Sequence, residues 1–144
     1  MLLTICSTVL PGCSFFADFY IVNNSEKAVT AIIQFTSPID EIKDSETSLS
    51  LRYSDTVFVV SDKTKELLSK KLTYIQTNSN TITIDIPKHS TVLVGGTINR
   101  AIAADTIKFV VSDTIREYTQ KTFSKHLTKT GGLFPPFHFT YKID

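Results

Sequence analysis

From Phe19 onward the chain consists of short β-like runs, and in most of them apolar and polar residues alternate with the two-residue period of half-buried β-strands. The clearest case closes the chain, where Phe137, Phe139, Tyr141 and Ile143 alternate with polar residues. Similar runs recur at roughly ten-residue spacing, separated by turn-forming clusters and without a strand–helix–strand rhythm. This pattern predicts a mainly all-β fold in one domain: an antiparallel β-sandwich, immunoglobulin-like or similar.

The turn clusters predict how some strands pair. Phe19–Val22 and Val29–Phe35 flank a short polar link and are expected to form a hairpin. Thr56–Val60, rich in β-branched residues, is expected to be a further strand. Gly95-Gly96 is expected to be a turn that ends a strand, and Ser112–Thr114 a hairpin turn.

Two short segments have helical rather than strand-like spacing. Asp62 is expected to cap a helix over Lys63–Lys71, with its adjacent leucines facing inward. Thr119 is expected to cap a second helix over Gln120–Thr128, ended by Gly131. Both are too short to be stable alone, so they are expected to pack over a sheet.

The first seventeen residues contain no charged side chain. Leu2–Leu10 has the length of a signal-peptide core and is too short to span a bilayer. It leads into Leu10-Pro11-Gly12-Cys13, which resembles the lipobox of bacterial lipoproteins. In that family the cysteine thiol receives a diacylglyceryl group, the chain is cut before the cysteine, and the new amine is acylated. The resemblance covers the first thirteen residues only.

The resemblance implies a lipid-anchored protein. Residues 1–12 would be a removed signal peptide, 13–17 a lipidated tether and 18–144 the sandwich domain, with fatty acids such as palmitate attached through Cys13. The expected location is the bacterial cell envelope, at the outer membrane and facing the periplasm. The acyl chains would supply the membrane contact, because each buried methylene adds about 0.8 kcal/mol.

Other interpretations of this segment stay open. It could be an ordinary first strand, or a signal peptide cut elsewhere. It could also be a membrane span that continues to Val22, although Asp18 would then lie in the hydrocarbon layer.

Charge and cysteine content exclude several classes of function. Lys and Arg number 15 and Asp and Glu 14, so the net charge of +1 gives no general attraction to nucleic acid. The only cysteines are Cys6 and Cys13. The predicted domain therefore has no disulfide, no cysteine-based zinc site and no thiol nucleophile.

No catalytic motif, metal site or cofactor site is expected. His89, His126 and His138 fall in three separate segments without metal-binding spacing, and no serine lies in a Gly-x-Ser-x-Gly elbow. His138 is expected on the outward, polar face of the last strand. A hydrolase or metal enzyme on a sandwich scaffold remains an alternative if a histidine meets carboxylates within about 5 Å in a cleft.

Two further groups of residues are candidate sites, one acidic and one aromatic. The acidic residues Asp40, Glu41, Asp44 and Glu46 are predicted to share one solvated loop without the glycine of a calcium-binding EF-hand. Three aromatic residues surround Pro135-Pro136 and are expected either to plug one end of the sandwich or to form a contact surface: Phe134, Phe137 and Phe139.

The leading expectation is therefore a non-catalytic, lipid-anchored envelope protein that acts as a binding or structural module. Its partner would be a protein or a glycan of unknown identity. A second alternative is a fibre or adhesion subunit, in which Phe15–Val22 or Phe137–Ile143 completes a neighbour's sheet.

Overall fold

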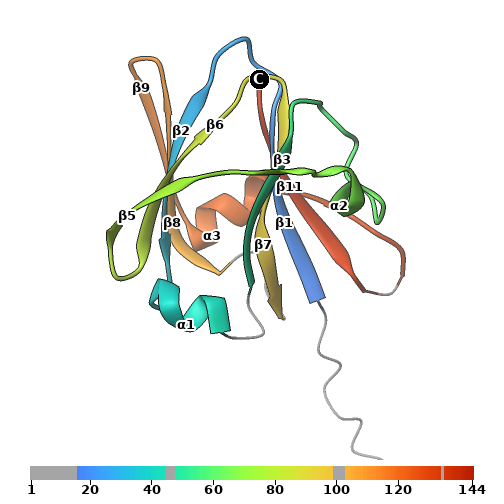
Figure 1. Cartoon of the computed structure of the whole chain (residues 1–144), viewed down its shortest axis with the longest axis horizontal. Coiled ribbons are helices and arrows are strands. Elements are labelled where there is room, and N and C mark those ends of the chain that lie inside the picture. The colour runs from blue at the N-terminus through green and yellow to red at the C-terminus, as the bar shows by residue number, and fades with distance from the viewer. Residues whose placement is uncertain (1–15, 45–47, 99–102, 134) are drawn as a thin grey trace, which may run out of the picture.

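A computed structural model of the chain describes residues 16–44, 48–98, 103–133 and 135–144. Within these residues the strands form two sheets packed face to face (Figure 1). Sheet A has the order β10 (Thr128–Thr130), β11 (Phe137–Ile143), β1 (Phe16–Asn23), β7 (Ser90–Ile98), β3 (Ser48–Ser54), β4 (Lys70–Lys71). Sheet B has the order β5 (Tyr74–Asn78), β6 (Thr81–Ile86), β2 (Val29–Phe35), β8 (Ala104–Val111), β9 (Thr114–Thr119). The predicted all-β sandwich is confirmed.

The strands of the two sheets are paired antiparallel, apart from one parallel pair at the centre of sheet A. β1 and β11 run side by side in register from Ala17 opposite Phe137 to Asn23 opposite Ile143. On its other side β1 pairs with β7 in the antiparallel sense, with a bulge between Phe19 and Tyr20. β1 and β11 are therefore both interior strands of sheet A.

The main core fills the space between the two sheets. Alternate residues of β1 (Phe19 and Ile21) and of β2 (Ala31 and Ile33) face this space and are buried. They pack with Phe109 and the apolar face of β6. The two-residue period seen in the sequence is therefore the period with which each strand turns side chains into this core.

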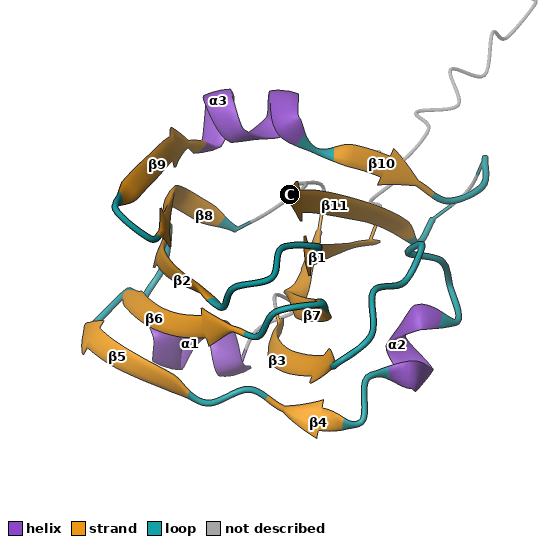
Figure 2. Ribbon diagram, turned by 90° about the horizontal axis from the view of Figure 1, so that it is seen from above, coloured by secondary structure: helices purple, strands orange, loops and turns teal. Residues whose placement is uncertain are grey.

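Chain connections cover both long sides of the sandwich. β9 leads through α3 (Gln120–Phe123) and the 3₁₀ helix η1 (Ser124–His126) into β10 of the other sheet. On the opposite side, β4 continues through two residues into β5 (Figure 2). The helix α1 (Ile39–Asp44) lies across one end. Each edge strand is thus continuous with an edge strand of the other sheet.

One of the two hairpin predictions is wrong and one is confirmed. β1 and β2 lie in different sheets, so the polar link after Asn23 carries the chain from one layer to the other. The apolar pattern of the two strands is the same in either arrangement, so it could not tell a hairpin from a crossover. The hairpin of β8 and β9 around Ser112–Thr114 is present.

Three local predictions are also wrong. Thr56–Val60 is not a strand and forms part of a covering segment described below. Gly95 and Gly96 lie inside β7, paired with Phe19 and Asp18, rather than in a turn. The predicted polar loop that contains Asp40 is largely the helix α1, which two buried isoleucines anchor to the main core.

The two predicted helices exist but are shorter than expected. α2 spans Thr64–Leu67 with Lys63 at its N-cap, and the chain then enters β4. Thr119 caps α3 as predicted, in a reciprocal capping box with Thr122. The first helix stops early because its last turn is used for the edge strand β4.

Several predictions concern residues 1–15, 45–47 and 134, which lie outside the described part of the chain. These include the signal peptide, Cys13, Glu46 and Phe134. β1 begins at Phe16, so the last two positions of the predicted tether belong to the first strand. Among the described residues, no helix has the length and apolar character needed to cross a membrane.

Candidate functional site

Sheet A has a second buried face, on the side away from sheet B. Residues 55–69, here called the cover segment, link β3 to β4 and include α2, which lies outside sheet A (Figure 2). The segment forms a small second core, the outer core, with the outward residues of β1 and β7. Its buried members are Tyr20, Val22, Val60, Leu68 and Leu93.

Hydrogen bonds fix the cover segment to sheet A along its length. The backbone N–H of Phe58 donates to Oγ1 of Thr91 at 3.0 Å, and that hydroxyl donates to the carbonyl of Thr56 at 2.9 Å. The guanidinium of Arg52 donates to the carbonyl of Leu68. Thr130 of β10 donates to the carbonyl of Val60 at 3.2 Å. The segment is therefore bound at its start, middle and end.

Where the outer core reaches the start of β1, apolar residues give way to a polar pocket of about 310 Å³. Asp18 of β1 lies opposite His138 of β11 and opposite Gly96 of β7, so all three share one row across the sheet. Glycine adds no side chain to this row, which leaves room for the pocket. Asp62 and Lys65 complete the polar lining from the cover segment.

His138 lies between two carboxylates. Its Nε2 is 2.7 Å from Oδ1 of Asp62, and its Nδ1 is 3.8 Å from Oδ2 of Asp18. An ionised carboxylate only accepts hydrogen bonds, so Nε2 carries the proton and donates to Asp62. Lys65 binds Asp18 from the other side, with Nζ 3.1 Å from Oδ1. The imidazole and the ammonium thus tie the cover segment to β11 and β1.

The members of this cluster differ sharply in exposure. Side-chain exposure is 3% for His138 and 13% for Asp18, against 51% for Lys65 and 78% for Asp62. The two residues on the sheet form the floor of the pocket and the two on the cover segment form its rim. A ligand could displace the rim groups without opening the sheet.

Among the described residues, three buried polar atoms beneath the cover segment have no hydrogen-bond partner: the Tyr20 hydroxyl, Nδ1 of His138 and Oγ1 of Thr140. They belong to the adjacent strands β1 and β11. Tyr20 lies opposite Thr140, two residues further along than the row of Asp18 and His138. The Tyr20 ring also meets the His138 ring edge to face, with centroids 5.9 Å apart. Burial raises the pKa of the Tyr20 phenol well above its usual range, and the negative charges of Asp18 and Asp62 raise it further.

The Asp62–His138 pair has one feature of a catalytic histidine and lacks another. Asp62 orients the His138 ring as a carboxylate orients a general base. However, Nδ1 is buried and makes no hydrogen bond to a serine, threonine or cysteine within the described residues. In this arrangement the cluster can hold protons and cations at fixed positions.

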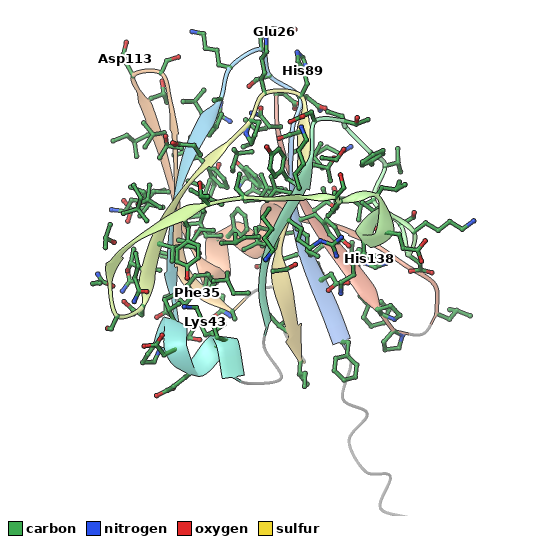
Figure 3. All side chains as sticks on the ribbon, viewed as in Figure 1. Glu26, Phe35, Lys43, His89, Asp113 and His138 are labelled. Carbon is green, nitrogen blue, oxygen red and sulfur yellow. The ribbon has the colours of Figure 1, made fainter. Side chains whose placement is uncertain are left out.

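The three histidines do not converge. His89 lies in a turn at the opposite end of the molecule, with Nε2 3.0 Å from Oε2 of Glu26 (Figure 3). His126 packs against the Tyr118 ring. His138 is on the predicted face of its strand, but the cover segment buries it, so the expectation of an outward residue is wrong. Within the described residues, no group of three or more histidines and carboxylates has the geometry to hold a metal ion.

The predicted aromatic surface is only partly described. Phe139 is half-buried and packs against the main core. The Phe137 ring is also half-buried, and its centroid lies 3.7 Å from Nζ of Lys129. Asp40 lies 3.9 Å from Lys43 of its own helix, as an ordinary solvated pair.

Sequence reasoning did not single out Asp18, Tyr20, Asp62 or Lys65 as site residues. One signal was available: Phe19–Val22 is apolar at every position, which is typical of a strand buried on both faces. It implied that some other segment covers the second face of the strand. The sequence alone could not show that this segment is residues 55–69.

Comparison with known proteins yields no relationship for this chain: no protein-family model, no curated protein and no solved structure matches it.

Proposed function

We propose that this protein is a non-catalytic binding module of the bacterial cell envelope, lipid-anchored through Cys13. The observation that carries the proposal is the position of the lipobox-like cysteine relative to the fold. Cys13 precedes the first residue of β1, Phe16, by three positions. Three residues span at most about 11 Å, so a lipid on Cys13 would hold the start of β1 close to the membrane surface.

Two features of the domain support this proposal. The polar pocket opens beside the start of β1, with Phe16 and Ala17 in its lining. The end of β11 lies at the opposite end of the sandwich, because the two strands run parallel (Figure 1). An anchor at Cys13 would therefore hold the pocket next to the bilayer and direct the other end outward.

Metabolic labelling tests the anchor. Cells that express the full chain are grown with an alkyne-tagged palmitate, and label is compared between wild type, Cys13→Ala and Cys6→Ala. We expect Cys13→Ala to lose the label and Cys6→Ala, the matched control, to keep it. Equal labelling of all three, or no label on the wild type, would reject the anchor.

A second candidate is hydrolysis with His138 as a general base, which the Asp62–His138 hydrogen bond in a pocket favours. It requires Asp62 or the cover segment to move so that a substrate reaches the ring. Hydrolysis of p-nitrophenyl acetate by wild type and by His138→Gln separates the two functions. A rate that falls to background in the variant supports the enzyme, and equal rates support the binding module.

The fibre alternative has less support. β1 and β11, the two strands expected to complete a neighbour's sheet, each lie between two strands of sheet A. Either would have to leave both partners before it could pair with another chain.

A further inference from the structure

The pocket at the start of β1 combines an apolar side with a polar floor. Phe16, Ala17 and Pro136 line one part, and Phe16 is largely exposed. Asp18 and His138 form the floor. A volume of about 310 Å³ lies at the lower end of the range for small-molecule sites, which begins at about 300 Å³. The pocket therefore has the size for a small group with one charged end.

The floor contains a hydrogen-bonding atom that the fold leaves unused. Nδ1 of His138 is buried and unpartnered although its ring lines the pocket. In the tautomer that carries its proton on Nε2 and donates it to Asp62, Nδ1 is an acceptor. An unpartnered buried polar group is destabilising, so a ligand that donates to Nδ1 removes this cost.

The charges that surround this atom select the sign of the ligand. Asp18 and Asp62 flank the ring, and the lining holds a single ammonium group, that of Lys65. That ammonium is already bound to Asp18 at 3.1 Å. Beside the imidazole, the lining thus holds two carboxylates against one ammonium. Such a site attracts a cation and repels a free anion.

We propose that this pocket binds an organic primary ammonium, R–NH₃⁺, which takes the position at Asp18 that the Lys65 ammonium now holds. The N–H groups of the ligand donate to Asp18 and to Nδ1 of His138, while Asp62 stays bound to Nε2 on the far side of the ring. The ligand's carbon chain lies against Phe16 and Pro136. Lys65, half exposed on a flexible stem, swings into solvent. The Lys65–Asp18 pair acts as an internal stand-in for the ligand.

This assignment names the ligand of the binding module proposed above and rests on that proposal only for the source of the amine. Beside a membrane, the ammonium of an ethanolamine headgroup is within reach of the pocket. A free small amine offers the same chemistry. The experiment therefore has one arm for soluble amines and one for lipid.

Calorimetric titration of the full chain carrying Cys13→Ala, with ethanolamine as the probe, tests the site without requiring lipidation. We expect Asp18→Asn to weaken binding at least about tenfold, as for loss of a hydrogen bond to a charged group. We expect Lys65→Met to strengthen it about three- to tenfold, because the internal competitor is removed. Lys108→Met, which removes the exposed lysine paired with Glu117 on sheet B, is the matched control and should bind like wild type.

The gain in Lys65→Met is the decisive result, because misfolding cannot produce tighter binding. Choline, which has no N–H donor, should bind at least about tenfold more weakly than ethanolamine. Tighter binding of choline, weaker binding in Lys65→Met, or no heat with either wild type or Lys65→Met would overturn the site. Binding of inorganic phosphate that is lost in Lys65→Met would overturn the assigned sign of charge.

The lipid arm uses vesicles of phosphatidylethanolamine and of phosphatidylcholine with the same Cys13→Ala chain. Preferential sedimentation with ethanolamine vesicles assigns the source to lipid, and binding of soluble ethanolamine without vesicle preference assigns it to a free amine. Both results support the pocket. Absence of palmitate label on the wild type, together with retained ethanolamine binding, would reject the anchor alone.

Discussion

The two buried faces of sheet A differ in how completely the buried polar atoms on them are hydrogen-bonded. The inner face packs against sheet B. Between the two sheets, the hydroxyls of Tyr118 and Tyr141 share a hydrogen bond of 3.0 Å. The outer face packs against the fifteen-residue cover segment, which is irregular chain apart from the helical turn α2. It leaves the Tyr20 hydroxyl, the His138 Nδ1 and the Thr140 hydroxyl without partners. β1 contributes alternate residues to both faces, so the strand itself does not cause the difference.

A facing sheet and a covering loop therefore bury the surface of a sheet in different ways. A facing sheet presents a regular apolar surface that excludes polar atoms, whereas a single covering segment follows only part of the surface beneath it. Its ends leave gaps where polar side chains collect. The candidate site lies at such a gap, with its floor on sheet A and its exposed rim on the cover segment.

The largest expected effect lies in the main core. Phe109 stacks on Tyr141 with ring centroids 4.6 Å apart and is buried. Phe109→Ala should lower the free energy of unfolding by about 3–5 kcal/mol, through lost transfer energy and a residual cavity. Phe16→Ala, at an exposed phenylalanine of the same sheet sandwich, is the control and should change it little. Chemical denaturation measures both, and equal effects would contradict the assigned core.

A smaller and more local effect is expected in the outer core. Leu68→Ala removes a fully buried side chain and should cost about 2–3 kcal/mol, since the irregular cover segment can partly collapse into the space. Amide exchange should quicken at Phe58, whose N–H binds Thr91, more than in β2 and β6. Leu67→Ala, at the exposed neighbour, should leave both readouts unchanged. Uniformly faster exchange would show that the two cores open together.

The smallest effect concerns the tyrosines of the two faces. Burial, above all, raises the pKa of Tyr141 to about 12 and that of Tyr20 further. The folded protein thus holds both phenol protons more tightly than the unfolded chain. Stability is complete below pH of about 10 and declines above it by about 1.4 kcal/mol per pH unit for each phenol.

Tyr20→Phe should therefore halve this alkaline slope up to about pH 12. At neutral pH it should leave stability unchanged or raise it by up to about 1 kcal/mol, because the hydroxyl has no partner. Tyr141→Phe should instead lower it by about 0.5–1.5 kcal/mol, through loss of the bond to Tyr118. Denaturant melts at pH 7 and pH 11 measure both, and a marked loss in Tyr20→Phe at pH 7 would reveal a hydrogen bond to that hydroxyl.

The same contrast explains how far the sequence could be interpreted. Alternation marks the residues that face the main core, so Phe139, Tyr141 and the strands that carry them were predictable. Alternation carries no information about which strands pair. The sequence therefore predicted that β1 pairs with β2, whereas β1 pairs with β7 and β11. The site was harder still. Asp18 and Asp62 are 44 positions apart, and their meeting depends on where an irregular segment without periodicity lies.

The parallel pairing of β1 with β11 has a consequence for when the domain can form. Each pair in this register joins residues 120 positions apart, from Ala17 with Phe137 to Asn23 with Ile143. As the chain is synthesised, β1 must wait for the last strand before one side of it is covered. Such distant pairing is slow, because the entropy of closing a long loop is lost before the contacts form. Sheet A is therefore finished only after synthesis of β11, and until then one edge of β1 lacks its hydrogen-bonding partner.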